Sequence, residues 1–164
     1  MVADIADLIK GIAKTPVVKR AITNHDVLNE AYSYKRPSSF SRGMRIELNG
    51  LVILLISGTA SIDENGKVVH VGDFRAQLRR TYHNITGLLV SEGATWKDVV
   101  RTTCYLRDIE RDYAAFNEER TNFFAEQGLD PLPASTGIQA ILCFPELLVE
   151  IEAIAMFRVP KTEE

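Results

Sequence analysis

The sequence predicts an α+β domain in which a mixed sheet of about six strands carries two main helices on one face. Three observations favour this class. Asn49-Gly50, a strong hairpin signal, separates two apolar runs. Two longer segments, about 73–93 and 112–128, repeat apolar residues at helical spacing. The apolar run at about 147–158 alternates as a strand does. The predicted order is β-β-β-α-β-α-β-β.

The length and the net charge of the chain limit the number of domains and the kinds of partner to expect. The 164 residues suffice for one domain with its own core. A formal net charge of -3 disfavours binding to a nucleic-acid backbone, which usually requires a basic surplus. The first residues carry no basic segment ahead of an apolar one, and the longest apolar run, 51–56, is too short to span a bilayer. We therefore expect a cytoplasmic protein that binds neither nucleic acid nor membrane.

Residues 1–39 differ from the rest and are predicted to form an N-terminal extension with a short helix, followed by one domain at 40–160. Apolar residues recur at helical spacing before Pro16. They are Ile5, Leu8, Ile9 and Ile12. Their shared face needs a partner, either the same domain or a neighbouring subunit.

The first half of the domain is predicted from its turns. The strands 44–48 and 51–57 flank Asn49-Gly50, and a second turn at 63–66 precedes a strand at 67–71. Asp73 is the expected N-cap of the first helix, and Gly93 ends it. The buried face of this helix is predicted to hold Phe74, Leu78, Thr81, Tyr82, Ile85, Leu88 and Leu89.

The second half alternates strand and helix. The run 99–106 is rich in β-branched residues, and a helix is expected from about Asp112 to Gly128. Two strands, at about 135–143 and 147–158, complete the sheet. The second helix repeats aromatic residues at helical spacing, namely Tyr113, Phe116, Phe123 and Phe124. The core is expected to contain Phe116, Phe123 and Phe124, together with Trp96. Because both helices cover one face, the other face needs a cover, and a trimer with a barrel-like centre would supply it.

Two carboxylates lie within the last apolar run. Alternation along a strand puts Glu150, Glu152 and Ile154 on one face and the larger apolar residues on the other. A carboxylate in an apolar interior is costly unless polar groups surround it, so one interpretation is a cleft with Glu150 as its acid or base. The alternative is that both glutamates lie on a solvated face of the sheet.

Several motifs together resemble the RidA/YjgF family over about residues 40–158. They are Ile56-Ser57-Gly58, Asn84, Pro133-Ala134 and the run from Val149 to Ala155. The resemblance implies a chorismate-mutase-like fold, a homotrimer and small-molecule sites in the clefts between subunits. Many members hydrolyse reactive enamines and imines, such as 2-aminoacrylate, to keto acids and ammonia.

The chain departs from that family at one position. Active deaminases of the family carry an arginine directly after the Pro-Ala motif, where its planar guanidinium binds the substrate carboxylate. Ser135 stands there in this chain. The family's catalytic glutamate lies fifteen residues further on, which corresponds to Glu150. The acid is thus kept while the carboxylate anchor is lost, and the resemblance leaves deaminase activity open.

Other polar residues are candidates for substrate binding. Ser135 and Thr136 could hold a substrate or a water, or could bond only their own backbone. Four arginines are candidates for the missing cation, or are solvated: Arg42, Arg45, Arg101 and Arg107. The segment 57–62 also resembles part of the chorismatases, which hydrolyse the enol-pyruvyl ether of chorismate, and Glu150 matches their acidic residue. Two further alternatives remain. One is a trimer that binds a metabolite without catalysis, and the other is a ribonuclease, an activity attributed to some family members.

No cofactor or metal site is readable in the sequence. His25, His70 and His83 have no metal-ligand spacing with one another or with a cysteine. No phosphate-binding glycine loop or dinucleotide fingerprint is present in the sequence. Cys104 and Cys143 both lie in apolar, strand-like runs and are predicted to be buried free thiols.

Overall fold

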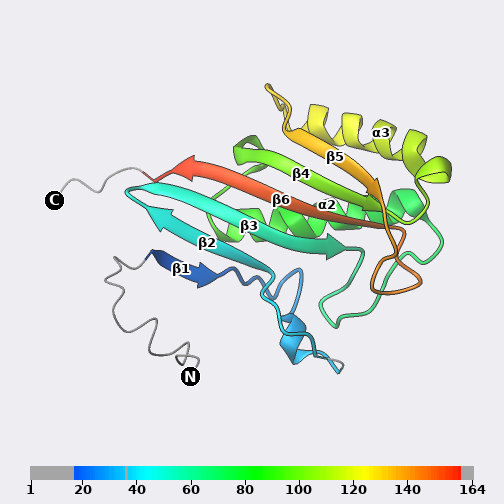
Figure 1. The fold of residues 1–164 in the computed structure, drawn as a ribbon, viewed down its shortest axis with the longest axis horizontal. Helices are drawn as coiled ribbons and strands as arrows, with labels where there is room; N and C mark the ends of the chain where they lie inside the picture. Colours follow the sequence, from blue (N-terminus) through cyan, green and yellow to red (C-terminus); the bar gives the residue numbers. More distant parts are fainter. Residues whose placement is uncertain (1–16, 36, 160–164) are drawn as a thin grey trace, which may run out of the picture.

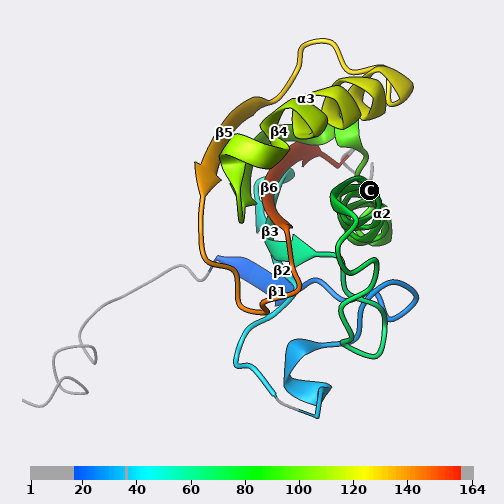
Figure 2. The same cartoon turned by 90° about the vertical axis from the view of Figure 1, so that its right-hand side faces the viewer.

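A computed structural model describes residues 17–35 and 37–159, which form one six-stranded sheet with two long helices (Figure 1). The strand order is β1-β2-β3-β6-β4-β5. The β4–β5 pair is parallel and the other neighbours are antiparallel, so the sheet is mixed. Figure 2 shows both helices on the same side of the sheet. These features confirm the predicted α+β class. The predicted helix at 5–12 lies outside the described residues.

The hairpin between β2 (Gly43–Leu48) and β3 (Leu51–Ala60) forms where the sequence predicted it. Asn49 and Gly50 both have positive φ, 49° and 77°, which is the backbone that a two-residue hairpin turn requires. Alternate residues of β3 point to the core, so that Val52, Leu54 and Ile56 are buried.

The sixth strand is not the one that the sequence predicted. The prediction of a strand at 67–71 is wrong: this segment makes a single bridge, Ile62 to Val68, and His70 has a φ of 59°, which interrupts an extended backbone. The extra strand is β1 (Val18–Ala21), which pairs antiparallel with β2. The segment before residue 40 therefore adds an edge strand to the sheet. All four residues of β1 are exposed, so the strand lacks the alternation of buried apolar and exposed polar residues that would mark it in the sequence.

Helix α2 (Phe74–Ser91) follows the prediction closely. The Asp73 side chain accepts a hydrogen bond from the Ala76 backbone N–H at 2.9 Å, which confirms it as the N-cap. Gly93, with a φ of 74°, follows the helix end. The buried face contains all seven predicted residues and also Gln77 and Asn84. The Gln77 amide donates to the Glu146 carbonyl and accepts from the Leu148 N–H, and the Asn84 Nδ2 atom donates to the Ala60 carbonyl at the end of β3. The buried Asn84 Oδ1 atom has no partner among the described residues.

Strand β4 (Val99–Leu106) has the predicted bounds, and α3 (Ile109–Glu126) begins one turn earlier than predicted because Asp108 is its N-cap. Phe123 stacks on Tyr82 of α2 with ring centroids 4.2 Å apart, and Trp96, in a short 3-10 helix (Trp96–Asp98), meets both rings edge-on. This cluster joins the two helices. Phe116 and Phe124 are buried, as predicted, whereas Tyr113 is 48% exposed.

The final strands are shorter than predicted. β5 (Ala134–Gln139) is an edge strand, and β6 (Val149–Arg158) lies between β3 and β4. Cys143 falls in the loop after β5 and is exposed, whereas Cys104 on β4 is buried. The prediction of two buried thiols is therefore wrong for Cys143, because β5 ends before reaching it. A short 3-10 helix (Ala31–Ser33) precedes β2.

Candidate functional site

Glu150 lies near the start of β6, on the face of the sheet that the helices leave uncovered. It is paired with Ala60 on β3 and with Tyr105 on β4. Val149 and Ile151 beside it point into the core and are fully buried, which confirms the alternation expected from the sequence. Glu152 on the same face is exposed and accepts a hydrogen bond from the Tyr105 hydroxyl at 3.0 Å.

A bulge in β3 makes room for the Glu150 side chain. The pairing of β3 with β6 shifts register between Ile56 and Thr59, so two residues, Ser57 and Gly58, stand opposite one. A Cβ atom at Gly58 would overlap the Glu150 carboxyl oxygen Oε1. Glycine at this position therefore lets the carboxyl group lie directly against the β3 backbone.

The environment of Glu150 favours its protonated form. Burial raises the pKa of this carboxyl group, and repulsion by the nearby Glu152 carboxylate raises the pKa further. A carboxylic acid that keeps its proton nearer to neutral pH is suited to act as a general acid.

Glu150 and Arg42 line the same cavity, of about 130 Å³. Its wall also contains Tyr34, Phe40, Gly58 and Phe144. Arg42 is only 5% exposed, and its guanidinium lies 5.1 Å from the centre of the Tyr34 ring and 5.4 Å from that of Phe40. Its Nε atom donates to the Asn29 carbonyl at 2.9 Å, while the buried Nη2 atom has no partner within 17–35 and 37–159. Two predicted site residues thus lie together.

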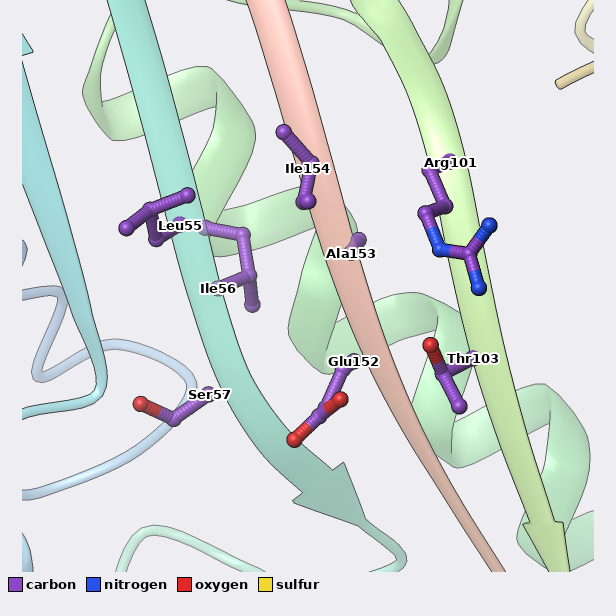
Figure 3. A pocket seen from close by; sticks show the side chains of 8 residues that line it. All are labelled: Leu55, Ile56, Ser57, Arg101, Thr103, Glu152, Ala153 and Ile154. Atoms are coloured by element: carbon purple, nitrogen blue, oxygen red, sulfur yellow. The ribbon is translucent and has the colours of Figure 1, made fainter. Parts of the chain in front are cut away.

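Arg101 and Thr136 form a second group on the same face. The Arg101 Nη2 atom donates to the Thr136 hydroxyl at 3.2 Å. Figure 3 shows Arg101 on β4 next to Thr103, with Glu152 on the adjacent β6, around an open hollow of about 300 Å³. Glu150 does not line this hollow, so the structure separates Arg101 from the predicted acid.

Ser135 lies on the opposite face of the sheet from Glu150. Its hydroxyl accepts hydrogen bonds from Thr102 at 3.0 Å and from the Arg120 Nη1 atom at 3.1 Å. Thr102 is buried beneath the helices, and Arg120 belongs to α3, so Ser135 faces the helix layer. Within one protomer a small substrate cannot contact both Ser135 and Glu150.

Sequence reasoning missed Arg120 altogether. The available signal was the i, i+3 pair Asn117 and Arg120, which shares one face of the predicted helix. The Arg120 Nη2 atom donates to the Asn117 side-chain oxygen at 2.6 Å. This spacing could not show which strand faces the pair, because that contact depends on how the helix packs.

In the described part of the chain, no group of three or more His, Cys, Asp or Glu residues is arranged to hold a metal ion. Within the same residues, neither long helix is apolar enough to cross a membrane.

Replacing Glu150 by glutamine should stabilise the protein in a pH-dependent way. Because the folded state raises the pKa of Glu150, it holds this proton more tightly than the unfolded chain does. The wild type should therefore lose stability as the pH rises from about 4.3, the usual glutamate value, through the raised pKa. Glutamine stays neutral, so the melting temperature of Glu150→Gln relative to wild type should increase between pH 4 and pH 8. A difference that does not change with pH would contradict this environment.

Comparison with known proteins agrees with the motifs. The chain is 38% identical to the 3-aminoacrylate deaminase RutC of Acinetobacter baylyi over 103 residues, which are 63% of this chain and 78% of that protein. It is 35% identical to a RutC family protein of Pyrococcus abyssi over 103 residues, which are 62% of this chain and 76% of the relative.

Solved structures share the fold. A Rid family protein of unknown function, YyfA from Yersinia pestis, superposes with a TM-score of 0.69 at 27% identity, over 84% of this chain and 98% of that one. The YjgF gene product of E. coli superposes with a TM-score of 0.68 at 25% identity, over 85% of this chain and 99% of that one. The family model described as Endoribonuclease L-PSP matches residues 34–157. The chain therefore belongs to the endoribonuclease L-PSP family, the RidA/YjgF family that its motifs resemble.

Proposed function

We propose that this protein hydrolyses small enamine or imine carboxylates to oxo acids and ammonia, in clefts between the subunits of a homotrimer. The observation that carries this proposal is Glu150, a carboxyl group with a raised pKa in a cavity that also contains a guanidinium. The similarity to a 3-aminoacrylate deaminase over most of that protein's length supports the reaction class.

The proposed reaction begins with a proton from Glu150. Protonated Glu150 donates to the nucleophilic carbon of the enamine, whose C=C electron pair forms the new C–H bond. The nitrogen lone pair forms a C=N bond at the same time, which gives an iminium ion. Water then adds to the C=N carbon and gives a proton to the Glu150 carboxylate, which restores the acid. The resulting carbinolamine expels ammonia as its hydroxyl proton moves to nitrogen and the C=O group forms. The Arg42 Nη2 atom can donate a hydrogen bond to the carbinolamine oxygen, which comes from the added water. An unpaired buried donor is costly, and such a bond would recover part of that cost.

The opposite placement of Ser135 and Glu150 supports a site shared between protomers. Ser135 lies on the exposed edge strand β5 and faces the helices, whereas Glu150 opens onto the uncovered face. If both contact one substrate, the β5 edge of one protomer must meet the uncovered face of another. In that arrangement Thr136 and Arg101 lie near the same junction and contribute substrate contacts.

The test is turnover by purified wild-type protein whose oligomeric state has been measured by sedimentation. We expect a trimer that releases ammonia and the matching oxo acid from 2-aminoacrylate, 3-aminoacrylate or a bulkier 2-imino acid, faster than buffer alone. Chorismate belongs in the same panel, because pyruvate release from it would instead support the chorismatase-like alternative. A monomer, or no turnover of any compound, would contradict the proposal. Ligands that stabilise the protein and are recovered unchanged would favour a binding role.

A further inference from the structure

The side chain of Arg120 occupies the space beside Ser135. It projects from α3 toward the edge strand β5, and its Nη1 atom donates to the Ser135 hydroxyl at 3.1 Å. A buried hydroxyl, Thr102, donates to the same oxygen at 3.0 Å, and the Cys104 sulfur lies 4.0 Å from it. The hydroxyl of Ser135 is therefore held in place from two sides, next to a guanidinium.

Arg120 is held by neutral groups and not by a carboxylate. Its second terminal nitrogen, Nη2, donates to the Asn117 amide oxygen at 2.6 Å, and its guanidinium carbon lies 4.8 Å from the centre of the Phe116 ring. Within 17–35 and 37–159, no acidic side chain forms an ion pair with it. The neighbouring acidic residues of α3, Glu118 and Glu119, pair instead with Arg75 and Arg79 of α2.

This arrangement leaves the positive charge of Arg120 available. Stacking on Phe116 and the Asn117 bond restrict the side chain, so little conformational entropy remains to be lost when an anion binds. Neutral oxygens do not cancel the charge. An oriented guanidinium of this kind suits a carboxylate, with which it forms short charge-assisted hydrogen bonds.

A cavity of about 400 Å³ adjoins the two residues. Its polar wall contains Arg120, Thr121 and Ser135. Much of its apolar wall comes from Phe124, Leu129 and Leu132. Its size lies within the usual range for small-molecule sites, which combine a mainly apolar lining with a few placed polar groups. A ligand that fits has a carboxylate at one end and an apolar side chain at the other.

We propose that Arg120, with the Ser135 hydroxyl, binds the substrate carboxylate, and that the adjoining cavity selects substrates with an apolar side chain, such as branched 2-imino acids. This inference rests on the proposed function for the identity of the substrate, but not for the binding of the carboxylate. Arg120 acts at the carboxylate end of the substrate, whereas Glu150 and Arg42 of the facing protomer act at the reacting carbon.

The test measures binding separately from turnover. The probes are 4-methyl-2-oxopentanoate, its methyl ester and pyruvate, titrated by calorimetry into wild type, Arg120→Met and Arg120→Lys. Wild type should bind the acid at least tenfold more tightly than the ester, and the branched acid more tightly than pyruvate. Arg120→Met should lose the preference for the acid over the ester, and Arg120→Lys should keep part of it. The control Arg79→Met, which removes an exposed arginine of α2, should behave as wild type.

A second variant protects the test against misfolding. Ser135→Arg in the Arg120→Met background returns a guanidinium to the same place and should restore the preference for the acid. If Arg120→Met folds and still prefers the acid as wild type does, the proposal is wrong. It is also wrong if wild type binds none of the probes. If wild type binds the acid through Arg120 but hydrolyses no imine, the proposed function fails while this assignment stands. With an active enzyme, Arg120→Met should raise KM much more than it lowers kcat.

Discussion

Replacing Glu150 by glutamine is expected to lower kcat/KM for imine or enamine hydrolysis by about 10²–10⁴-fold, the usual contribution of a positioned general acid. Glutamine has nearly the same shape as glutamic acid and fits the same space over Gly58, but it has no acidic proton to donate. The loss should appear mainly in kcat, because the substrate carboxylate is bound elsewhere. Steady-state assays of ammonia release on the most active substrate measure it.

Glu152→Gln is the matched control for that experiment. Glu152 lies two residues further along β6 and on the same face, but it is exposed and bonded to the Tyr105 hydroxyl. We expect less than a tenfold loss for this variant. Wild-type kcat should fall on the alkaline side, as the pH rises through the raised pKa of Glu150, because only the protonated form can donate. Equal losses in the two variants would show that the acid has been assigned to the wrong residue.

Local signals predicted much of the fold. Asn49-Gly50 requires the positive φ angles that the hairpin has, and Asp73 bonds the first turn of α2 as its position suggested. These contacts join residues that are close in sequence. By contrast, β1 has no buried side chain, and its place in the sheet depends on pairing with β2, more than twenty residues away. Such an element cannot be recognised from its own composition.

The candidate site shows the same division. Alternation along β6 was enough to orient Glu150 relative to Val149 and Ile151, because a strand alternates regardless of its neighbours. The contact between Arg120 and Ser135 spans fifteen residues and depends on how α3 lies on β5. Helix α3 carries two arginines, and only packing shows that Arg120 meets a hydroxyl while Arg111 pairs with the Asp112 carboxylate.

An ion pair with a buried carboxylate adds to the backbone pairing that attaches the edge strand β1 to the fold. Glu92 is the C-cap residue of α2, and its side chain is only 2% exposed. Its two carboxyl oxygens accept hydrogen bonds from the Arg20 guanidinium of β1 at 2.8 and 2.6 Å. Arg45 of β2 approaches the same carboxylate at 3.4 Å and donates to the Glu92 backbone carbonyl at 3.1 Å. One carboxylate therefore joins two strands to a helix end.

Replacing Glu92 by alanine is accordingly expected to lower the free energy of unfolding by about 3 kcal/mol, because it removes the buried carboxylate from the mostly buried Arg45 guanidinium. The control is Glu47→Ala, which removes the other carboxylate bonded to Arg45. Because the Glu47 side chain is 42% exposed, this variant should lower the free energy of unfolding by only about 0.5 kcal/mol. Urea unfolding measures both losses. Hydrogen exchange should show faster exchange at 18–21 in Glu92→Ala, since β1 would keep only its backbone pairing with β2. If both variants lose a similar amount of unfolding free energy, the prediction is wrong. The buried Glu92 carboxylate would then stabilise the fold no more than the partly exposed Glu47 carboxylate does.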